Sequence, residues 1–384
     1  MKKTVNLSMA AALVRFLQRQ YISRDGVEHR LIHGVWGIFG HGNVTGFGQA
    51  LEEYGGRALP YLQAKNEQAM VHAAVAFAKA RQRLGTFACT SSIGPGATNM
   101  VTGAGVATVN RLPVLLLPGD IFSNRRPSPV LQQLEHPHSQ DVSVNDCFRP
   151  VSRYWDRINR PEQILTALPE AMRILADPVE TGAVTIAMPE DVQAESHAFP
   201  EHFFEKRVHV VDRPACATAA LREAAALIRR ARRPLIVAGG GVHYSDATAA
   251  LARFCDATGI PVAVTQAGKG AILDAHRCCL GAVGVTGTAA ANAIAIDADV
   301  VINLGTRLSD FTTASKTQFQ NPRVRFVAVN LHPADARKHG AIPLVGDARA
   351  VLGQLTRALA GWRVPASHRA DVARHRAAWD TTRA

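Results

Sequence analysis

A carboxylate and a glycine-rich loop follow one another in this sequence in a pattern that could do chemistry. Glu67 comes directly after Asn66, at the start of a segment, 67–84, whose apolar spacing predicts a helix, and the loop SSIGPGATN covers 91–99. A glutamate at a helix N-terminus gains about 0.3 to 1 kcal/mol from the helix dipole, which is one sufficient reason for its presence. A glutamate beside a ligand can also hold or move a proton. Which explanation applies depends on what the loop brings near it.

The loop at 91–99 suits close contact with a flat ligand. Gly94 and Gly96 carry no Cβ, so the backbone could approach a ring where a side chain would intrude. An ordinary turn from a strand into a helix uses the same residue types. Both explanations remain open on the residues alone.

The elements that would position these residues alternate between strands and helices. Apolar runs predict, in order, strands at 31–39, 58–63, 86–90, 112–117 and 183–191, with helices at 47–54, 67–84 and 161–177. Such alternation implies parallel strands joined by right-handed crossovers, and ligands of such sheets bind beyond the carboxyl ends of the strands. The glycine-rich turns at 40–43 and 94–96 both fall at such ends.

A second series of strands and helices follows a charged segment and completes the expected fold. The sequence therefore predicts an α/β protein with two doubly wound parallel-sheet domains. The expected divisions are a first domain at 1–192, a strand-poor linker at 193–218, a middle domain at 219–361 and a tail at 362–384. Gly239-Gly240-Gly241 follows a strand as in a dinucleotide-binding turn, but Tyr244 stands where the third glycine should be, which disfavours a nicotinamide dehydrogenase.

Composition narrows the functional classes. The balance of 47% hydrophobic and 19% charged residues indicates a globular protein, and no apolar run is long enough to span a membrane. The formal charge of +12 comes from scattered arginines without interleaved aromatic residues, so we expect no nucleic-acid binding. The six cysteines form no CxxC pair, so we expect neither a zinc site nor disulfides, and a reducing cytoplasm as the location. Glu135, His136, His138 and Asp141 could be metal ligands by type, but the proline among them indicates a loop and their spacing fits no helical pair, so we expect no metal site there.

The block from Asn66 to Pro118 resembles the pyrimidine-binding domain of thiamine diphosphate enzymes of the acetolactate synthase superfamily. The resemblance implies that 1–192 is this pyrimidine-binding domain and 219–361 a Rossmann-like middle domain. It also implies that Glu67 contacts N1′ of the aminopyrimidine, with Gly94, Pro95, Gly96 and Asn99 beside the ring. A glutamate at N1′ favours the imino tautomer, whose exocyclic nitrogen can take the proton from C2 of the thiazolium.

Further segments, IFGHGNVTGFGQALE, KNEQAMVHAA, PVLQQLE, RPVSRYWDRINRPEQ and QAGKG, are similar to the trihydroxycyclohexane-dione hydrolase family of inositol breakdown. This similarity implies hydrolytic ring opening of trihydroxycyclohexane-1,2-dione to 5-deoxy-glucuronate, with thiamine diphosphate and Mg²⁺, in a cytoplasmic dimer or tetramer. His41 is then a candidate proton donor or acceptor facing the substrate, with a structural role in its turn as the alternative. Gln132 and Gln133 are candidate substrate contacts.

One expected part of such an enzyme is missing from the sequence pattern. Superfamily members hold Mg²⁺ and the diphosphate through a GDG motif and a later asparagine in a third domain, whereas here the near matches, at Gly119-Asp120 and Gly346-Asp347, lack that continuation. We therefore expect the metal ligands in another domain and little turnover by this chain alone. The chain would then be a truncated product, a fragment of a longer chain, or part of a split enzyme whose third domain is a separate chain. The alternatives are an acetolactate synthase-like carboligase, a 2-oxoacid decarboxylase, or a non-catalytic binding or assembly module.

Overall fold

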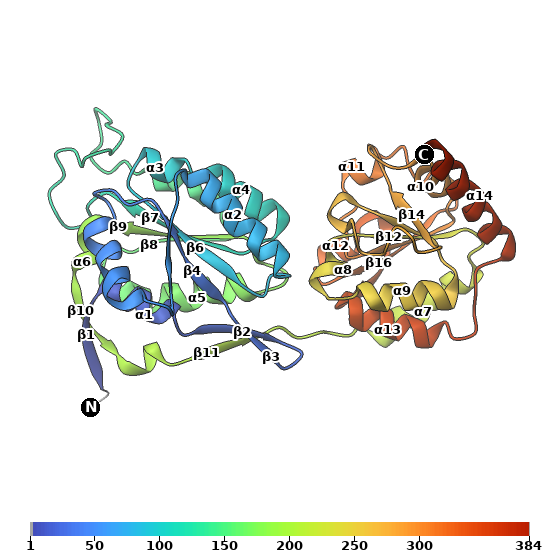
Figure 1. The fold of residues 1–384 in the computed structure, drawn as a ribbon, viewed down its shortest axis with the longest axis horizontal. Coiled ribbons are helices and arrows are strands. Elements are labelled where there is room, and N and C mark those ends of the chain that lie inside the picture. The colour runs from blue at the N-terminus through green and yellow to red at the C-terminus, as the bar shows by residue number, and fades with distance from the viewer. Residues whose placement is uncertain (1–2, 384) are drawn as a thin grey trace. The chain divides into compact units, whose positions relative to one another are not determined.

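The structure is a computed structural model that describes residues 3–383 and divides into two compact units, Met1–Asp212 and Arg213–Ala384 (Figure 1). Each unit is an α/β domain built on a six-stranded sheet, so the predicted fold class is confirmed. Within the described residues, no helix combines the length and the apolar character that crossing a bilayer would need.

The main sheet of the first unit has the strand order β5-β4-β6-β7-β9-β8, and all its neighbouring strands are parallel. Its strands are β4 (Ile32–Gly37), β5 (Tyr61–Gln63), β6 (Thr86–Ser91), β7 (Val114–Asp120), β8 (Tyr154–Arg157) and β9 (Ala183–Pro189). Every residue of β7 and β9 is buried, as expected of parallel strands covered on both faces by helices. Because the strands are parallel, the segments that follow β4, β6, β7 and β9 all meet at one edge of the sheet.

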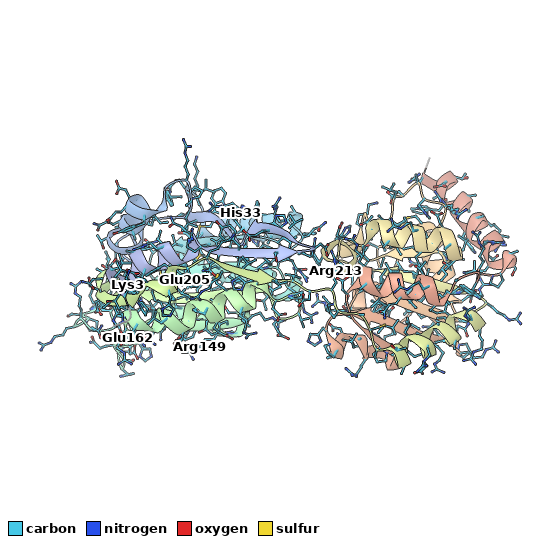
Figure 2. The ribbon with its side chains drawn as sticks, turned by 90° about the horizontal axis from the view of Figure 1, so that it is seen from below. Lys3, His33, Arg149, Glu162, Glu205 and Arg213 are labelled. Carbon is cyan, nitrogen blue, oxygen red and sulfur yellow. The ribbon has the colours of Figure 1, made fainter. Side chains whose placement is uncertain are left out.

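Helices cover both faces of this sheet (Figure 1). One face carries α2 (Glu67–Ala80) and α4 (Val101–Asn110), preceded by the short α3 (Pro95–Thr98), and the other carries α1 (Met9–Leu17) and α5 (Ile164–Ala176). On the α2 side, the ring of His33 from β4, labelled in Figure 2, packs edge-on against Phe77. The helix predicted at 47–54 is present as two π-helical turns, Val44–Gly48 and Leu51–Gly55. Short helical segments complete the unit: η3 (Val144–Val151), η4 (Pro161–Gln163), α6 (Glu190–Ala194) and η5 (Glu201–Phe204).

The segment expected to be a strand-poor linker carries two strands that belong to the first unit. Strand β10 (Ser196–Pro200) pairs antiparallel with β1 (Thr4–Ser8), and β11 (Arg207–Val210) pairs parallel with β2 (Gln20–Arg24), which also pairs with β3 (Val27–Arg30). The buried rings of Phe199 and Phe203 fix this segment to the core, and Phe203 stacks on Phe16 at 4.7 Å. Charged residues around the two strands, among them Glu195, Glu201 and Glu205, hide the strands from an interpretation based on pattern, and the division between units falls after Asp212.

The second unit has the parallel strand order β14-β13-β12-β15-β16-β17. Its strands are β12 (Pro234–Ala238), β13 (Val262–Val264), β14 (Cys279–Ala282), β15 (Val300–Leu304), β16 (Arg325–Asn330) and β17 (Ile342–Val345). Its helices are α7 (Thr218–Arg230), α8 (Gly241–Tyr244), α9 (Thr248–Thr258), α10 (Ala289–Ile296), α11 (Asp310–Thr313), α12 (Pro333–Ala336), α13 (Ala348–Ala358) and α14 (Ala366–Arg383), with short 3-10 turns at Gln266–Gly268 and Lys338–Gly340. Arg213, labelled in Figure 2, lies at the start of this unit, and it binds Asp347 at 3.2 Å.

The glycine turn after β12 is used for close backbone packing inside the second unit. A Cβ on Gly239 would lie 2.4 Å from the Gly305 carbonyl oxygen, and one on Gly241 would lie 2.6 Å from the Gly305 Cα. Real Cβ atoms do not approach other atoms this closely, so both positions need glycine for packing alone. The turn therefore has a structural explanation that needs no dinucleotide.

The tail expected after residue 361 is an ordered helix for most of its described length. Helix α14 packs on α10, and its own residues His368 and Val372 are buried. The His368 Nε2 donates a hydrogen bond to the Pro234 carbonyl at 3.1 Å, and Arg233 binds Asp371 at 3.1 Å. These contacts are spread thinly over a polar helix, which is why hydrophobic periodicity did not reveal them.

Candidate active site

Glu67 and the glycine-rich loop meet at the carboxyl edge of the first sheet. Glu67 is the first residue of α2, where the Asn66 side chain caps the helix by accepting a hydrogen bond from the Ala69 amide at 2.9 Å. The Asn99 Nδ2 donates to the Glu67 Oε2 at 2.7 Å, and the Glu67 side chain is half-buried. The structure thus joins the two features that the sequence places 32 residues apart.

The two glycines of the loop have different surroundings. A Cβ on Gly96 would lie 3.3 Å from the Glu67 Oε1, so the absence of a side chain keeps the second carboxylate oxygen open. Gly94 has a φ of +67°, and a Cβ there would lie 2.0 Å from the Gln132 carbonyl oxygen. Gly94 is therefore required by its left-handed backbone and by the loop that crosses it. Pro95, between them, is exposed.

The turn that carries His41 is fixed across the top of the sheet. Buried Asn43 closes the turn, because its Oδ1 accepts from the Gly40 amide at 3.0 Å and its Nδ2 donates to the Thr90 hydroxyl at 3.0 Å. The His41 Nε2 lies 2.8 Å from the Leu131 carbonyl oxygen, which can only accept, so this nitrogen carries the proton. His41 is half-buried and reaches toward the loop after β7.

Gln193 is an anchor of this turn that sequence reasoning missed. Its side chain is fully buried, its Nε2 donates to the Gly42 carbonyl at 2.8 Å and to the Met188 carbonyl at 2.9 Å, and its Oε1 accepts from the Phe47 amide at 3.1 Å. It thus ties the His41 turn to the end of β9. The sequence offered no signal, because a glutamine after a strand has no pattern of its own.

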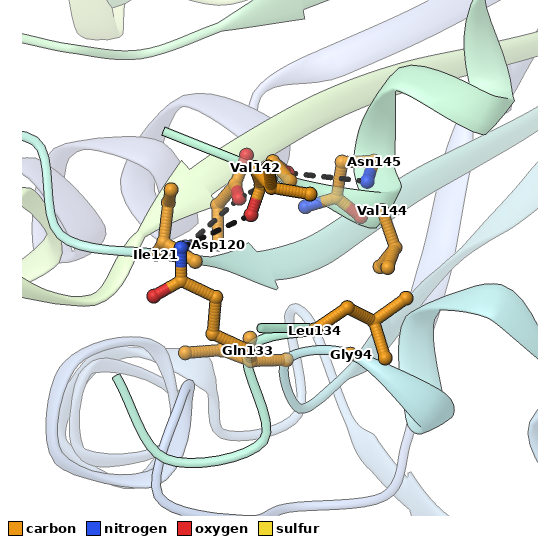
Figure 3. Close-up of a pocket in the computed structure, with 10 residues that line it drawn as sticks. Gly94, Asp120, Ile121, Gln133, Leu134, Val142, Val144 and Asn145 are labelled. Carbon is orange, nitrogen blue, oxygen red and sulfur yellow. Dashed lines mark hydrogen bonds between the residues drawn. The ribbon is translucent and has the colours of Figure 1, made fainter. Parts of the chain in front are cut away.

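The irregular segment after β7 is clamped over the same edge. Asp120, at the end of β7, accepts from the Arg157 Nε at 2.8 Å and from the Ser143 hydroxyl, and the buried Asn145 donates to the Gly119 carbonyl at 2.9 Å. Asp120 and Asn145 line one side of a small pocket whose other side includes Gln133 (Figure 3). The clamp holds the segment in place although it has almost no regular structure.

The two glutamines predicted as substrate contacts lie in this segment with different surroundings. Gln133 uses its amide inside the segment, donating to the carbonyls of Gln140 and Val142 and accepting from the Val130 amide. Gln132 is exposed, and its backbone carbonyl rather than its side chain approaches Gly94. Neither arrangement tests the predicted contact with substrate.

Within residues 3–383, no three or more His, Cys, Asp or Glu side chains form a cluster that could hold a metal ion, at this edge or elsewhere. Glu135, His136 and His138 are exposed, and the His136 Nδ1 accepts from the His138 amide at 3.3 Å. The residues that are present suit an aminopyrimidine instead. A carboxylate with one oxygen held by an amide and the other open beside a glycine can share a proton with a ring nitrogen.

Comparisons with known proteins define the class. Residues 20–142 match the N-terminal thiamine pyrophosphate (TPP) binding domain of thiamine pyrophosphate enzymes, and residues 221–355 match the central domain of the same enzymes. The chain therefore belongs to the thiamine pyrophosphate enzyme family. The first match contains Glu67, His41 and the glycine-rich loop.

Curated relatives point to one branch of that family. The chain is 50% identical over 377 residues to the 3D-(3,5/4)-trihydroxycyclohexane-1,2-dione hydrolase of Clostridium botulinum (strain Alaska E43 / Type E3), covering 98% of this chain and 58% of the relative. It is 49% identical over 379 residues to the enzyme of the same name from Bacillus cereus (strain AH820), covering 99% of this chain and 59% of the relative. The chain spans less than two thirds of the length of these relatives, and its resemblance to this hydrolase family is confirmed.

Proposed function

We propose that this chain binds the aminopyrimidine of thiamine diphosphate through Glu67 and takes part in the hydrolytic ring opening of trihydroxycyclohexane-1,2-dione to 5-deoxy-glucuronate. The observation that carries the proposal is the Asn99 to Glu67 hydrogen bond of 2.7 Å beside Gly96. The names of the two relatives above support the choice of substrate. They also favour this reaction over a carboligase or a 2-oxoacid decarboxylase.

The residues of the site divide the work as follows. Asn99 holds the Glu67 Oε2, which leaves the Oε1 to hold or return a proton at N1′ of the ring. Gly96 provides the space for the ring edge because it has no Cβ. When bound, thiamine diphosphate supplies a carbon nucleophile for addition to a ketone. His41, on the neighbouring turn, is proposed to exchange a proton with the substrate.

Several properties of the whole enzyme belong to the same proposal. We propose that Mg²⁺ accompanies the diphosphate, with ligands from another domain on a longer or a partner chain, because the described residues offer no acidic cluster for it. A dimer or tetramer would bring such a domain to Glu67. Cytoplasmic location is supported by six free cysteines, five of them buried.

The test of Glu67 is a binding measurement on the chain as it stands. Thiamine diphosphate is titrated against the native chain, Glu67→Gln and Glu52→Gln, whose carboxylate is exposed on a neighbouring turn. Because glutamine cannot share the ring proton, we expect Glu67→Gln to weaken binding by about tenfold, a typical effect of a lost charged hydrogen bond, and Glu52→Gln to have no effect. Equal binding by all three proteins would reject the proposal and favour the non-catalytic module.

Substrate choice is tested separately. The chain is combined with the diphosphate-binding domain of a relative and supplied with thiamine diphosphate and Mg²⁺. We expect consumption of trihydroxycyclohexane-1,2-dione and no consumption of pyruvate. Turnover of pyruvate alone would move the assignment to a carboligase or decarboxylase that uses the same glutamate.

A further inference from the structure

Asn145 carries a buried acceptor atom that no described residue satisfies. The residue is 1% exposed, and its Oδ1 meets no hydrogen-bond donor among the described residues. Its Nδ2 donates to the Gly119 carbonyl at 2.9 Å, and since a carbonyl oxygen can only accept, the orientation of the amide is fixed. The main chain of Asn145 is held as well, because its carbonyl accepts from the Trp155 Nε1 at 2.9 Å. A buried acceptor without a donor is uncommon unless a molecule other than the chain supplies the donor.

Asn145 lines the small pocket beyond the end of β7, and its Oδ1 is the unsatisfied atom there. The other polar side chains of the wall are occupied, because Ser143 donates to Asp120 and Gln133 uses both ends of its amide within its own segment. Asn145 and Gln133 lie on opposite sides of the pocket (Figure 3). The rest of the wall is formed by apolar residues and a glycine, namely Ile93, Gly94, Ile121, Leu134, Val142 and Val144. One acceptor in an apolar wall suits a single hydroxyl group on a neutral carbon skeleton.

The segment that covers this pocket, residues 126–142, is held loosely along its middle. Val130 is its one buried residue. Among the described residues, one hydrogen bond joins this covering segment to the rest of the unit, from the His41 Nε2 to the Leu131 carbonyl at 2.8 Å. The apolar side chains of Leu131 and Leu134 are 68% and 51% exposed. Few contacts therefore oppose an outward movement of the middle of the segment.

Both ends of the covering segment are fixed, and the pocket is closed between them. The amides of residues 123–125 donate to the Asp191 carboxylate, and Ser143 donates to Asp120. With the segment in this position, the space left by the described residues is too narrow for a complete water molecule, so solvent does not satisfy the Asn145 Oδ1. This position leaves a buried acceptor unmatched at a cost in free energy, which outward movement of the middle relieves. A ligand hydroxyl on Asn145 would give the closed position the donor that it lacks.

We propose that the Asn145 Oδ1 accepts a hydrogen bond from one hydroxyl group of a neutral polyhydroxylated ketone, and that the covering segment closes over this ligand. The inference rests on the proposed function and deepens it, since it names a residue that recognises the substrate of the Glu67 site. The pocket borders Gly94, and Gly96 of the same loop lies beside Glu67. In this role Asn145 moves no proton, and it determines which ligands fit.

The proposal implies a preference between ligands that differ by one hydroxyl group. A ligand without that hydroxyl closes the segment over an unmatched acceptor, whereas the complete ligand supplies the donor. The difference in affinity should be about tenfold, the order of one hydrogen bond whose loss leaves a buried partner unpaired. This ratio depends on the Asn145 Oδ1 and not on the stability of the segment, which affects both ligands alike.

Titration calorimetry of the whole chain measures this preference. A pentahydroxycyclohexanone and its monodeoxy analogues are each titrated into the native chain, Asn145→Ala and Asp191→Asn. We expect the native chain to bind one analogue about tenfold more weakly than the parent ketone, and Asn145→Ala to bind these two ligands equally. Asp191→Asn is the matched control, because it loosens the segment at residues 123–125 but keeps the Asn145 Oδ1, so its affinities should fall together and the ratio should remain. Equal binding of all analogues by the native chain, no binding of the parent ketone, or a ratio that survives in Asn145→Ala overturns the proposal.

Trp155 provides a readout that a loss of stability would not imitate. Its indole N–H donates to the Asn145 carbonyl, so its nitrogen-15 NMR signal reports on this residue, and Trp155→Phe assigns the signal. The parent ketone should shift the signal and slow the amide exchange of residues 131–140 in the native chain, because the ligand holds the covering segment closed. Asn145→Ala should lose this slowing. A native chain in which the ligand changes neither the Trp155 signal nor the exchange of the segment contradicts the closure.

The outcomes are separable from those of the Glu67 test, because the ketone titrations contain no thiamine diphosphate. If Glu67→Gln binds the cofactor as tightly as the native chain, the proposed function is rejected, while a tenfold ratio that disappears in Asn145→Ala would still establish the hydroxyl site. If Glu67→Gln weakens cofactor binding but the native chain shows no preference among the analogues, the Asn145 site alone is rejected.

Discussion

The ion pair between Asp120 and Arg157 gives the sharpest stability prediction. Asp120 is 1% exposed and Arg157 is 20% exposed, with 2.8 Å between the Arg157 Nε and the Asp120 Oδ2. Burial lowers the pKa of Arg157, but the carboxylates of Asp120 and Asp146 outweigh burial and raise it above its ordinary value. The guanidinium therefore stays charged in the folded state and needs its partner.

Replacing Asp120 with Asn keeps the side-chain shape but removes the charge. Breaking a buried pair by removing one partner costs about 3 to 5 kcal/mol. Arg157 keeps a contact with Asp146 at 3.2 Å and retains some access to water, so we expect the lower end, about 3 kcal/mol. The segment after β7 should also loosen, because the hydroxyl of Ser143, within that segment, donates a hydrogen bond to the Asp120 carboxylate.

The assay is amide hydrogen exchange of β7 and β9, which reports the free energy of unfolding of the first unit by itself. The control is Glu170→Gln, which breaks an exposed pair with Arg173 and should change stability by no more than about 0.5 kcal/mol. Limited trypsin cleavage after Arg125 should become faster in Asp120→Asn. If Asp120→Asn matches the Glu170→Gln control in exchange and cleavage, the clamp has been misjudged.

Two further predictions concern the loop glycine and the last helix. Gly94→Ala should lower the melting temperature and destabilise the first unit by at least about 1 to 2 kcal/mol, because the φ of Gly94 is +67° and a Cβ there would collide with backbone. The control, Gly353→Ala inside α13, should be neutral or stabilising by up to about 1 kcal/mol. An unchanged melting temperature of Gly94→Ala would contradict the geometry. Burial lowers the pKa of His368, so the stability it contributes is present above the unfolded value of about 6.5 and is lost as pH falls below it. The protection of α14 amides, measured relative to their intrinsic exchange rate at each pH, should therefore fall between about pH 7.5 and 5, and His368→Gln should flatten that fall.

The sequence could predict the parts of the site that depend on local pattern and on parallel topology. Alternating strands and helices place every loop that follows a strand at one edge, so Glu67 and the 91–99 loop had to lie near each other. Asn99 and Glu67 are 32 residues apart in the sequence, and this topology alone brings the two segments that carry them to the same edge. Nothing local could predict the role of Gln193. Its side chain binds the backbone of Phe47 and Gly42, which precede it in the sequence by 146 and 151 residues.

The strands of the charged linker were missed because they are held by β1 and β2, which come from the other end of the unit in the sequence.

The loop SSIGPGATN shows how one motif can combine two tasks that sequence cannot separate. Gly94 and Gly96 left the same two explanations open, a turn or a ring contact, because both lack a Cβ. The folded chain separates them: the Gln132 carbonyl fills the space at Gly94, while the space at Gly96 faces the Glu67 carboxylate. The separation depends on a segment that lies well beyond the loop in the chain, has no regular structure and is placed by Asp120 and Asp191. A ring contact stays a prediction at both glycines; Gly96 has open space beside Glu67, and Gly94 is in addition required by the loop that covers it.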